Sequence, residues 1–389
     1  MTLASQADPE LLLSVEDLRV EFRSGPGRVR AVNGITFELA AHETLGIVGE
    51  SGCGKSVTSL AIMGLLPKPA GRIAGGKVIF DGTDLVQLKA DEMRDLRGRD
   101  VAMVFQDPMT SLNPVITIEE QLVEVIRAHD SKTTKSAAHD RAIELLELVG
   151  IPNPSVRLRG YAHQLSGGMR QRVMIAIALA LNPKLIIADE PTTALDVTIQ
   201  AQILELIQRV ANETGAAIML ITHDLGVVAG MTQRIQVMYA GRIVETATTQ
   251  DLFAHPRHPY TVGLLRSIPR LDLGDNRALI PIDGLPPDMT RERTGCPFAP
   301  RCAWAIEHCL TEDPELAPVV PGQRTIAAGP DANHRVACWH PATDAEAATG
   351  VPASGHVSAI TAATQARVAA ATASLIEPSQ AAASPDEDT

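Results

Sequence analysis

Short apolar runs alternate with helical patterns along the first 250 residues or so of the chain. Residues 11–23 are apolar at nearly every second position, which predicts a half-buried strand. Residues 31–39 predict another strand or strand pair, and residues 44–48 form the continuous apolar run typical of a short buried strand. An apolar helix is expected at 57–66, before a proline that cannot continue it. This alternation of strands and helices predicts an α/β fold.

The alternation is interrupted once, in the middle of this region. Helices are predicted at 115–127, 136–149 and 169–181, without a strand between them. We therefore expect a helical subdomain at about 107–182, inserted in a domain that spans 1–255. Further strands are predicted at 77–80, 101–105, 185–190, 217–221 and 235–239, the last forming a hairpin with 242–245.

The pattern changes after residue 255. Residues 256–340 are punctuated by Pro and Gly, show little periodicity and contain both tryptophans, Trp304 and Trp339. We expect them to form an irregular extension. The segment 341–389 is rich in Ala, Ser and Thr and ends in acidic residues, so we expect a disordered tail, in which 360–375 can form a transient helix.

Composition narrows the function classes. The 389 residues carry a formal net charge of -12 and only 3% aromatics, which argues against nucleic acid as a partner. The longest apolar run, 173–181, is far shorter than the ~20 residues of a membrane-spanning helix. Residues 1–10 lack the basic and apolar regions of a secretory signal. We expect a chain that does not cross a bilayer by itself.

The segment between the strand at 44–48 and the helix at 57–66 has the form G-x-x-x-x-G-K-[ST]. It consists of Gly49, Glu50, Ser51, Gly52, Cys53, Gly54, Lys55 and Ser56. Glycines let backbone N–H groups converge on one anion, and the positive helix end adds attraction. Lys55 can reach the β- and γ-phosphates of a nucleotide, and the Ser56 hydroxyl can bind Mg²⁺. The alternative is an ordinary Gly-rich turn before a helix.

Polar residues that suit nucleotide hydrolysis follow three predicted strands. Gln106 comes after 101–105 and is suited to hold Mg²⁺ or an attacking water. Asp189 fits a carboxylate that holds Mg²⁺ through water, and Glu190 fits the group that orients and deprotonates the attacking water. His223 follows the next strand and suits a γ-phosphate sensor. Capped strand ends are the structural alternative for these residues.

A second glycine-containing helix start lies at Ser166, Gly167 and Gly168, with Ser166 as its expected N-cap. One phosphate loop does not need a second anion site for the same phosphates. We therefore expect this helix start to face the γ-phosphate held by another subunit.

In this order, the motifs resemble those of the ATP-binding subunits of ABC transporters. The correspondence covers about 11–255: Walker A at 49–56, the Q-loop Gln106, the signature at 165–169, Walker B at 185–189 with Glu190, the D-loop at 194–196 and the switch His223. The resemblance implies a P-loop NTPase (RecA-like) core with an antiparallel β subdomain. It also implies a head-to-tail dimer with ATP between one Walker A and the opposite signature.

The same resemblance implies further residues in contact with the nucleotide. Val57 and Asp196 are added at the first helix and at the D-loop. Phe22 lies upstream, where such ATPases often place a ring against adenine, although a core strand residue is an equal alternative.

A narrower resemblance concerns residues 105–114, 169–176 and 255–261, the last containing the sequence H-P-Y-T. They are similar to the D-type ATPase subunits of oligopeptide and dipeptide permeases. The resemblance implies ATP hydrolysis that powers import, a homologous F-type ATPase partner, two transmembrane permeases and an extracytoplasmic peptide-binding protein. The subunit would be peripheral on the cytoplasmic face of the membrane. Alternatives are a nickel or other small-solute importer, a DNA-associated ABC ATPase and a catalytically silent nucleotide-binding module.

Four of the five cysteines gather in the extension. Cys296, Cys302, Cys309 and Cys338 have the spacings C-x₅-C, C-x₆-C and a further 29 positions. Four thiolates can hold zinc or a [4Fe–4S] cluster, and structural zinc usually shows tighter pairs. The D-type permease ATPases carry a similar set, and that resemblance implies the iron–sulfur cluster. Zinc ranks second and two disulfides third.

Overall fold

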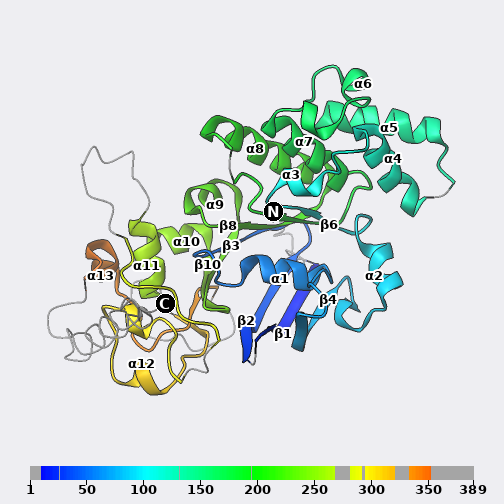
Figure 1. The fold of residues 1–389 in the computed structure, drawn as a ribbon. Coiled ribbons are helices and arrows are strands. Elements are labelled where there is room, and N and C mark those ends of the chain that lie inside the picture. Colours follow the sequence, from blue (N-terminus) through cyan, green and yellow to red (C-terminus); the bar gives the residue numbers. More distant parts are fainter. Residues whose placement is uncertain are drawn as a thin grey trace, which may run out of the picture.

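A computed structural model describes residues 10–25, 27–130, 132–193, 195–267, 281–290, 294–319 and 333–351 (Figure 1). It contains two β-sheets with helices around them. In this part of the chain no helix has the length and apolarity needed to cross a membrane.

The larger sheet has eight strands in the order β11-β12-β10-β9-β3-β8-β7-β6. The five strands from β9 to β6 are parallel, and β10, β12 and β11 continue the sheet in antiparallel fashion. Every residue of β3, β6, β7 and β8 is buried, which explains their continuous apolar sequences. The bounds are β3 (Thr44–Val48), β6 (Val101–Val104), β7 (Leu185–Asp189), β8 (Ala217–Thr222), β9 (Arg234–Tyr239), β10 (Arg242–Thr248), β11 (Ala317–Pro318) and β12 (Arg335–Val336).

The smaller sheet is antiparallel, with the order β2-β1-β4-β5. Helix α1 (Lys55–Ile62) contacts both this sheet and β7 of the larger one. Apolar side chains of both sheets and of α1 form one core cluster, which fixes the start of α1 between the sheets. The strands are β1 (Leu11–Ser24), β2 (Gly27–Ala40), β4 (Gly71–Phe80) and β5 (Thr83–Asp84).

The helices expected in the middle of the chain gather beyond β6 (Figure 1). The first expected helix of this group begins three residues later than predicted, because Thr117 and Glu120 form a capping box. The helices from β6 to β7 are α3 (Pro108–Ser111), α4 (Ile118–His129), α5 (Lys135–Leu148), α6 (Pro154–Arg157) and α7 (Gly167–Ala178). The P-loop NTPase core with an antiparallel β subdomain and an inserted helical subdomain is thus confirmed.

Of the remaining helices of four residues or more, α2 lies beside the smaller sheet, and the others lie around the larger sheet or in the extension (Figure 1). They are α2 (Ala90–Leu96), α8 (Val197–Thr214), α9 (Leu225–Met231), α10 (Thr249–Ala254), α11 (Pro259–Arg266), α12 (His308–Thr311) and α13 (Asp344–Thr349). One apolar cluster joins Leu145 of α5 with Phe298 and Trp304 of the extension, so the extension shares the core of the ATPase domain.

The extension is more regular than its sequence suggests. Strand β12 pairs with β10, so the extension completes the larger sheet. Helix α13 lies within 341–389, where we expected a disordered tail, because Thr343 and Glu346 cap it and Glu346 is buried. Residues 352–389, with the transient helix expected at 360–375, lie outside the described residues.

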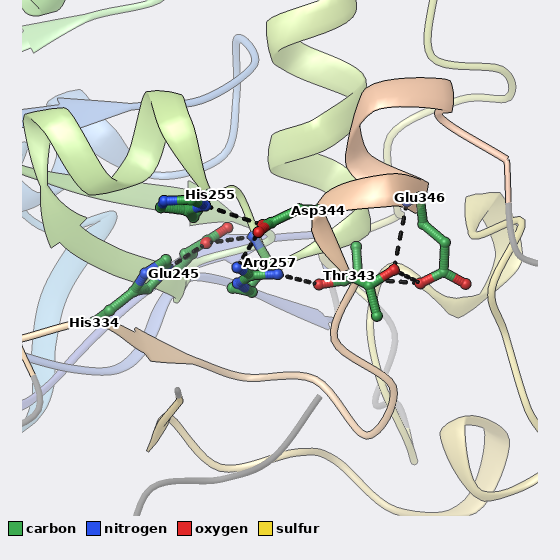
Figure 2. A network of polar contacts seen from close by, with 8 residues as sticks. Glu245, His255, Arg257, His334, Thr343, Asp344 and Glu346 are labelled. Atoms are coloured by element: carbon green, nitrogen blue, oxygen red, sulfur yellow. Dashed lines mark hydrogen bonds and ion pairs between the residues drawn. The ribbon is translucent and has the colours of Figure 1, made fainter. Parts of the chain in front are cut away.

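A buried polar network fastens the extension to β10 (Figure 2). The Glu245 carboxylate is fully buried and accepts hydrogen bonds from the backbone N–H groups of Arg257 and His258, at 2.7 and 2.9 Å. His334 Nε2 lies 2.7 Å from the same carboxylate. Arg257, also fully buried, donates to Asp344 Oδ1 at 2.7 Å. The H-P-Y-T segment therefore connects the sheet to both β12 and α13.

Candidate functional site

The phosphate loop lies between β3 and α1, as the sequence predicts. Gly54 has a φ of +107°, and a Cβ there would lie 2.4 Å from the Ala31 carbonyl oxygen, so only glycine fits. Lys55 is buried, and its Nζ donates to the carbonyl oxygens of Gly49 (2.8 Å) and Glu50 (3.0 Å). The loop thus curls around its own lysine, and the ammonium group lies inside the ring of backbone that would surround a phosphate.

Two oxygen ligands suited to Mg²⁺ lie side by side at the end of β7. Ser56 Oγ donates a 2.9 Å hydrogen bond to Asp189 Oδ1. Burial raises the pKa of Asp189 above its usual range, and the Ser56 hydrogen bond partly opposes that shift. A cation would favour the ionised carboxylate, so these two side chains fit a hard divalent ion.

Glu190 is held in a strained conformation by three other polar side chains. Its φ of +46° lies in the left-handed region, which is unfavourable for Glu. Its Oε2 accepts hydrogen bonds from Gln106 Nε2 (3.0 Å) and Thr193 Oγ1 (2.9 Å), and its Oε1 lies 3.3 Å from His223 Nδ1. Gln106, Glu190 and His223, predicted from three separate strand ends, are therefore together; Thr193 was not predicted.

A cavity of about 250 Å³ lies between the phosphate loop and the pair formed by Gln106 and Glu190. The phosphate loop forms one part of its lining, and Gln106 and Glu190 form another. Phe22 does not line this cavity. It pairs with Gly71 of β4 and packs against the core cluster formed by the two sheets and α1. The cavity is lined by Ala31, Ser51, Gly52, Gly54, Lys55, Ser56, Val57, Gln106 and Glu190.

The signature residues lie apart from this cavity. Ser166 is exposed and caps α7 by accepting a hydrogen bond from the Met169 N–H at 3.4 Å. Asp196 is also exposed and caps α8, accepting from the Ile199 N–H at 2.9 Å. A Cβ on Gly168 would lie 3.0 Å from Ile199, so the two helix starts are adjacent. Ser166, Gly167 and Asp196 are exposed and Gly168 is half-buried, and together they form one surface.

The four cysteines of the extension are near one another and largely buried. The Cys296 N–H donates to the Cys309 carbonyl oxygen at 2.8 Å. Burial raises the pKa of all four thiols, that of Cys296 to about 11, and each of Cys302 and Cys338 is further raised by neighbouring thiols of the set. All are free, so the two disulfides considered above are wrong. In the described residues no group of three or more His, Cys, Asp or Glu is arranged to hold one metal ion.

Two contacts on the phosphate loop were not anticipated. Arg301 makes hydrogen bonds of 2.7 and 3.0 Å to the two carboxylate oxygens of Glu50. The Glu50 N–H donates to Tyr260 Oη at 2.8 Å. Both partners follow residue 255 and no local pattern links them to the loop.

Two known protein families match different parts of the chain. Residues 32–193 match the ABC transporter family, and residues 244–309 match the oligopeptide/dipeptide transporter C-terminal region. The second match includes the H-P-Y-T segment and three of the four clustered cysteines.

Two relatives are similar in sequence to most of the chain. The dipeptide transport ATP-binding protein DppD of Bacillus subtilis is 52% identical over 330 residues, covering 85% of this chain and 95% of that protein. The oligopeptide transport ATP-binding protein OppD of Escherichia coli is 49% identical over 319 residues, covering 82% and 93%.

A solved dimeric ATP-binding cassette in a post-hydrolysis state, bound to ADP and Pi, is 28% identical. It superposes with a TM-score of 0.55 and covers 61% of this chain and 99% of its own. The chain therefore belongs to the ATP-binding subunits of the oligopeptide/dipeptide family of ABC transporters, which are ATPases coupled to transport.

Proposed function

We propose that this chain hydrolyses ATP to power the import of oligopeptides or dipeptides, from the cytoplasmic face of the membrane. The observation that carries the proposal is the cavity that joins the phosphate loop to Gln106 and Glu190. The names of the relatives favour peptide over nickel and over a DNA-associated role. Glu190 and its three polar partners favour turnover over a silent nucleotide-binding module.

In this proposal the phosphate loop and Lys55 bind the β- and γ-phosphates of ATP. Ser56, Asp189 and Gln106 would hold Mg²⁺, which when bound neutralises charge on the phosphate oxygens. Glu190 orients the attacking water and accepts its proton, while the Gln106 and Thr193 hydrogen bonds fix its carboxylate. His223, whose Nδ1 lies 3.3 Å from Glu190 Oε1, would act as the γ-phosphate sensor.

A second ATPase subunit would complete the site. The surface formed by Ser166, Gly167, Gly168 and Asp196 lies away from the cavity of its own chain, which suits contact with the nucleotide of an F-type partner. Closure of this pair on ATP would drive two transmembrane permeases, which receive peptide from an extracytoplasmic binding protein. The nucleotide-binding domain is assigned to 1–255 and the extension to 256–340.

A test of this function uses the intact complex purified from membranes. We expect two permeases and a second ATPase to co-purify with the chain, and the ATPase rate of the reconstituted complex to rise when peptide and binding protein are added. Lys55→Ala in this chain serves as the control and should lose nucleotide binding at its site. Stimulation by nickel and not by peptide would contradict the proposal.

We also propose that Cys296, Cys302, Cys309 and Cys338 hold a [4Fe–4S] cluster with a structural role. The donor chemistry fits: four mutually close thiols lie in a buried region whose apolar surroundings oppose thiolate formation unless positive iron compensates. Zinc is the second choice, because structural zinc sites usually have cysteine pairs spaced more closely than C-x₅-C and C-x₆-C.

Anaerobically purified protein is therefore expected to be brown, to absorb broadly near ~400 nm, and to contain iron and acid-labile sulfide. Cys302→Ser should lower the iron content. Cys53→Ser is the matched control, because Cys53 is the one cysteine outside the set, and its iron content should be unchanged. Colourless protein with one zinc per chain and no sulfide would favour zinc.

A further inference from the structure

The phosphate loop is held from outside by the C-terminal extension. We propose that Arg301 is a positioning residue for ATP binding: its ion pair with Glu50 fixes the loop and neutralises a carboxylate that would otherwise repel the phosphates. The segment between Cys296 and Cys302 sets where Arg301 lies. This inference rests on the proposed nucleotide site.

The Arg301–Glu50 contact has the geometry of a strong ion pair. Nη1 lies 2.7 Å from Oε2 and Nη2 lies 3.0 Å from Oε1, so the guanidinium binds the carboxylate with two parallel hydrogen bonds. The Arg301 side chain is 5% exposed and that of Glu50 26%, so water screens the pair weakly. Such a pair restricts both the position and the orientation of the Glu50 side chain.

Arg301 is itself fixed by several other contacts. Its Nε donates to the Asp283 carbonyl oxygen at 2.9 Å and its Nη2 to the Ile282 carbonyl oxygen at 3.2 Å. Its guanidinium carbon lies 5.9 Å from the ring centroids of both Tyr239 and Phe298. An arginine with this many partners is preorganised and can hold the loop at little further entropic cost.

The backbone of Glu50 is held from the same side. Its N–H donates to the hydroxyl of Tyr260, a buried residue whose ring lies 4.6 Å from Tyr239 and 5.4 Å from Phe298. Both the side chain and the N–H of Glu50 are therefore bound by residues of the extension. The polar network of Figure 2 anchors the extension independently at β10, so these contacts come from a fixed body.

The position of Glu50 matters for the phosphates in two ways. Its carbonyl oxygen is one of the two that accept from Lys55 Nζ, so a shift of Glu50 moves a partner of the phosphate-binding lysine. Its carboxylate belongs to the loop that receives a polyanion. Glu50 does not line the cavity, but without Arg301 its negative charge would be unpaired within the loop that receives the phosphates.

The element that carries Arg301 is bounded by two of the clustered cysteines. Arg301 ends the single-turn helix η3 (Ala299–Arg301). The Ala299 N–H donates to the Cys296 carbonyl oxygen at 3.1 Å, and the Cys302 N–H donates to the Ala299 carbonyl oxygen at 3.2 Å. A group bound by both Cys296 and Cys302 would therefore fix both ends of η3. Because Arg301 ends η3, that group would also fix the position of the Arg301 side chain that holds Glu50 of the phosphate loop.

A double-mutant cycle on the full chain tests whether Arg301 affects ATP binding through Glu50. Binding of a fluorescent ATP analogue is measured for wild type, Arg301→Met, Glu50→Gln and the double variant. We expect Arg301→Met to weaken binding about tenfold, as for loss of a partly buried charge partner. In the Glu50→Gln background the same change should cost about threefold or less, because no carboxylate is then left unpaired.

Matched variants separate this effect from general damage. Arg242→Met removes another ion pair between the ATPase domain and the extension, with Asp313 at 2.7 Å, that does not touch the loop; its nucleotide affinity should equal that of wild type. Arg301→Lys keeps the charge but loses the two-bond geometry, so an intermediate affinity is expected, and it replaces Arg301→Met if that variant does not fold.

Two results would overturn the inference: wild-type affinity in Arg301→Met, or the same loss with and without Glu50. Lys55→Ala in the same assay keeps the two proposals distinct, because normal binding by that variant would reject the nucleotide site itself. Cys302→Ser with native circular dichroism should weaken ATP binding in the same direction as Arg301→Met. Undiminished binding by Cys302→Ser, with its iron lost, would remove the cysteine segment from this route.

Discussion

ATP hydrolysis by the assembled complex is expected to fall about 10²–10⁴-fold at the sites of this chain when Glu190 is replaced by Gln. The substitution preserves the size of the side chain and its contact with His223 but removes the basic carboxylate oxygen. Nucleotide binding should persist, because Lys55 and the loop are unchanged. Phosphate release in a single turnover, measured beside ATP-analogue binding, distinguishes the two steps.

The partner subunit must be held constant in this experiment, since it contributes to both composite sites. Glu213→Gln is a suitable control, because this exposed carboxylate of α8 lies outside the cavity. It should leave the rate unchanged. Normal turnover by Glu190→Gln at its own site would remove Glu190 from the role of general base.

The largest loss of stability is expected from Glu245→Leu. The substitution leaves two backbone N–H groups and His334 without their acceptor in a fully buried position. Breaking a buried charged network in this way costs about 3–5 kcal/mol. The extension should detach first, so limited proteolysis after residue 255 and urea unfolding should both show the change.

A similar pair on the surface supplies the comparison. His308 and Glu312 of the extension lie 3.1 Å apart but are 47% and 61% exposed. Glu312→Leu should therefore change the free energy of unfolding by no more than about 1 kcal/mol. Equal stability of the two variants would show that the Glu245 network does not fasten the extension.

Gln106 and Glu190 could be found from the sequence because each follows a short run of consecutive apolar residues, the pattern of a fully buried strand. Residues 101–104 and 185–188 are apolar and fully buried, and Gln106 and Glu190 follow them within two residues. Parallel strands deliver such residues to one edge of the sheet. Local sequence therefore pointed to Gln106 and Glu190 one by one, and the structure adds the 3.0 Å hydrogen bond between them.

Contacts that depend on distant segments left no comparable signal. Arg301 and Glu50 are 251 positions apart, and neither has a neighbour that indicates an ion pair. Strand β12 is only two residues long, too short to show alternation, and it forms because β10 offers it a partner. Helix α13 does have a local signal, the capping box of Thr343 and Glu346, but its short Ala-rich sequence resembles the tail that follows, and burial of Glu346 distinguishes it only in the structure.

The pairing of β12 with β10 also bears on aggregation. Without it, β10 would present unpaired N–H and C=O groups along a strand that is buried from Ile243 to Ala247, and such an edge can pair with strands of other chains. The added strands move the sheet boundary outward to β11, which is two residues long and contains Pro318, a residue with no N–H to offer. A cassette shortened at residue 255 would lose this protection together with the partners of Glu245.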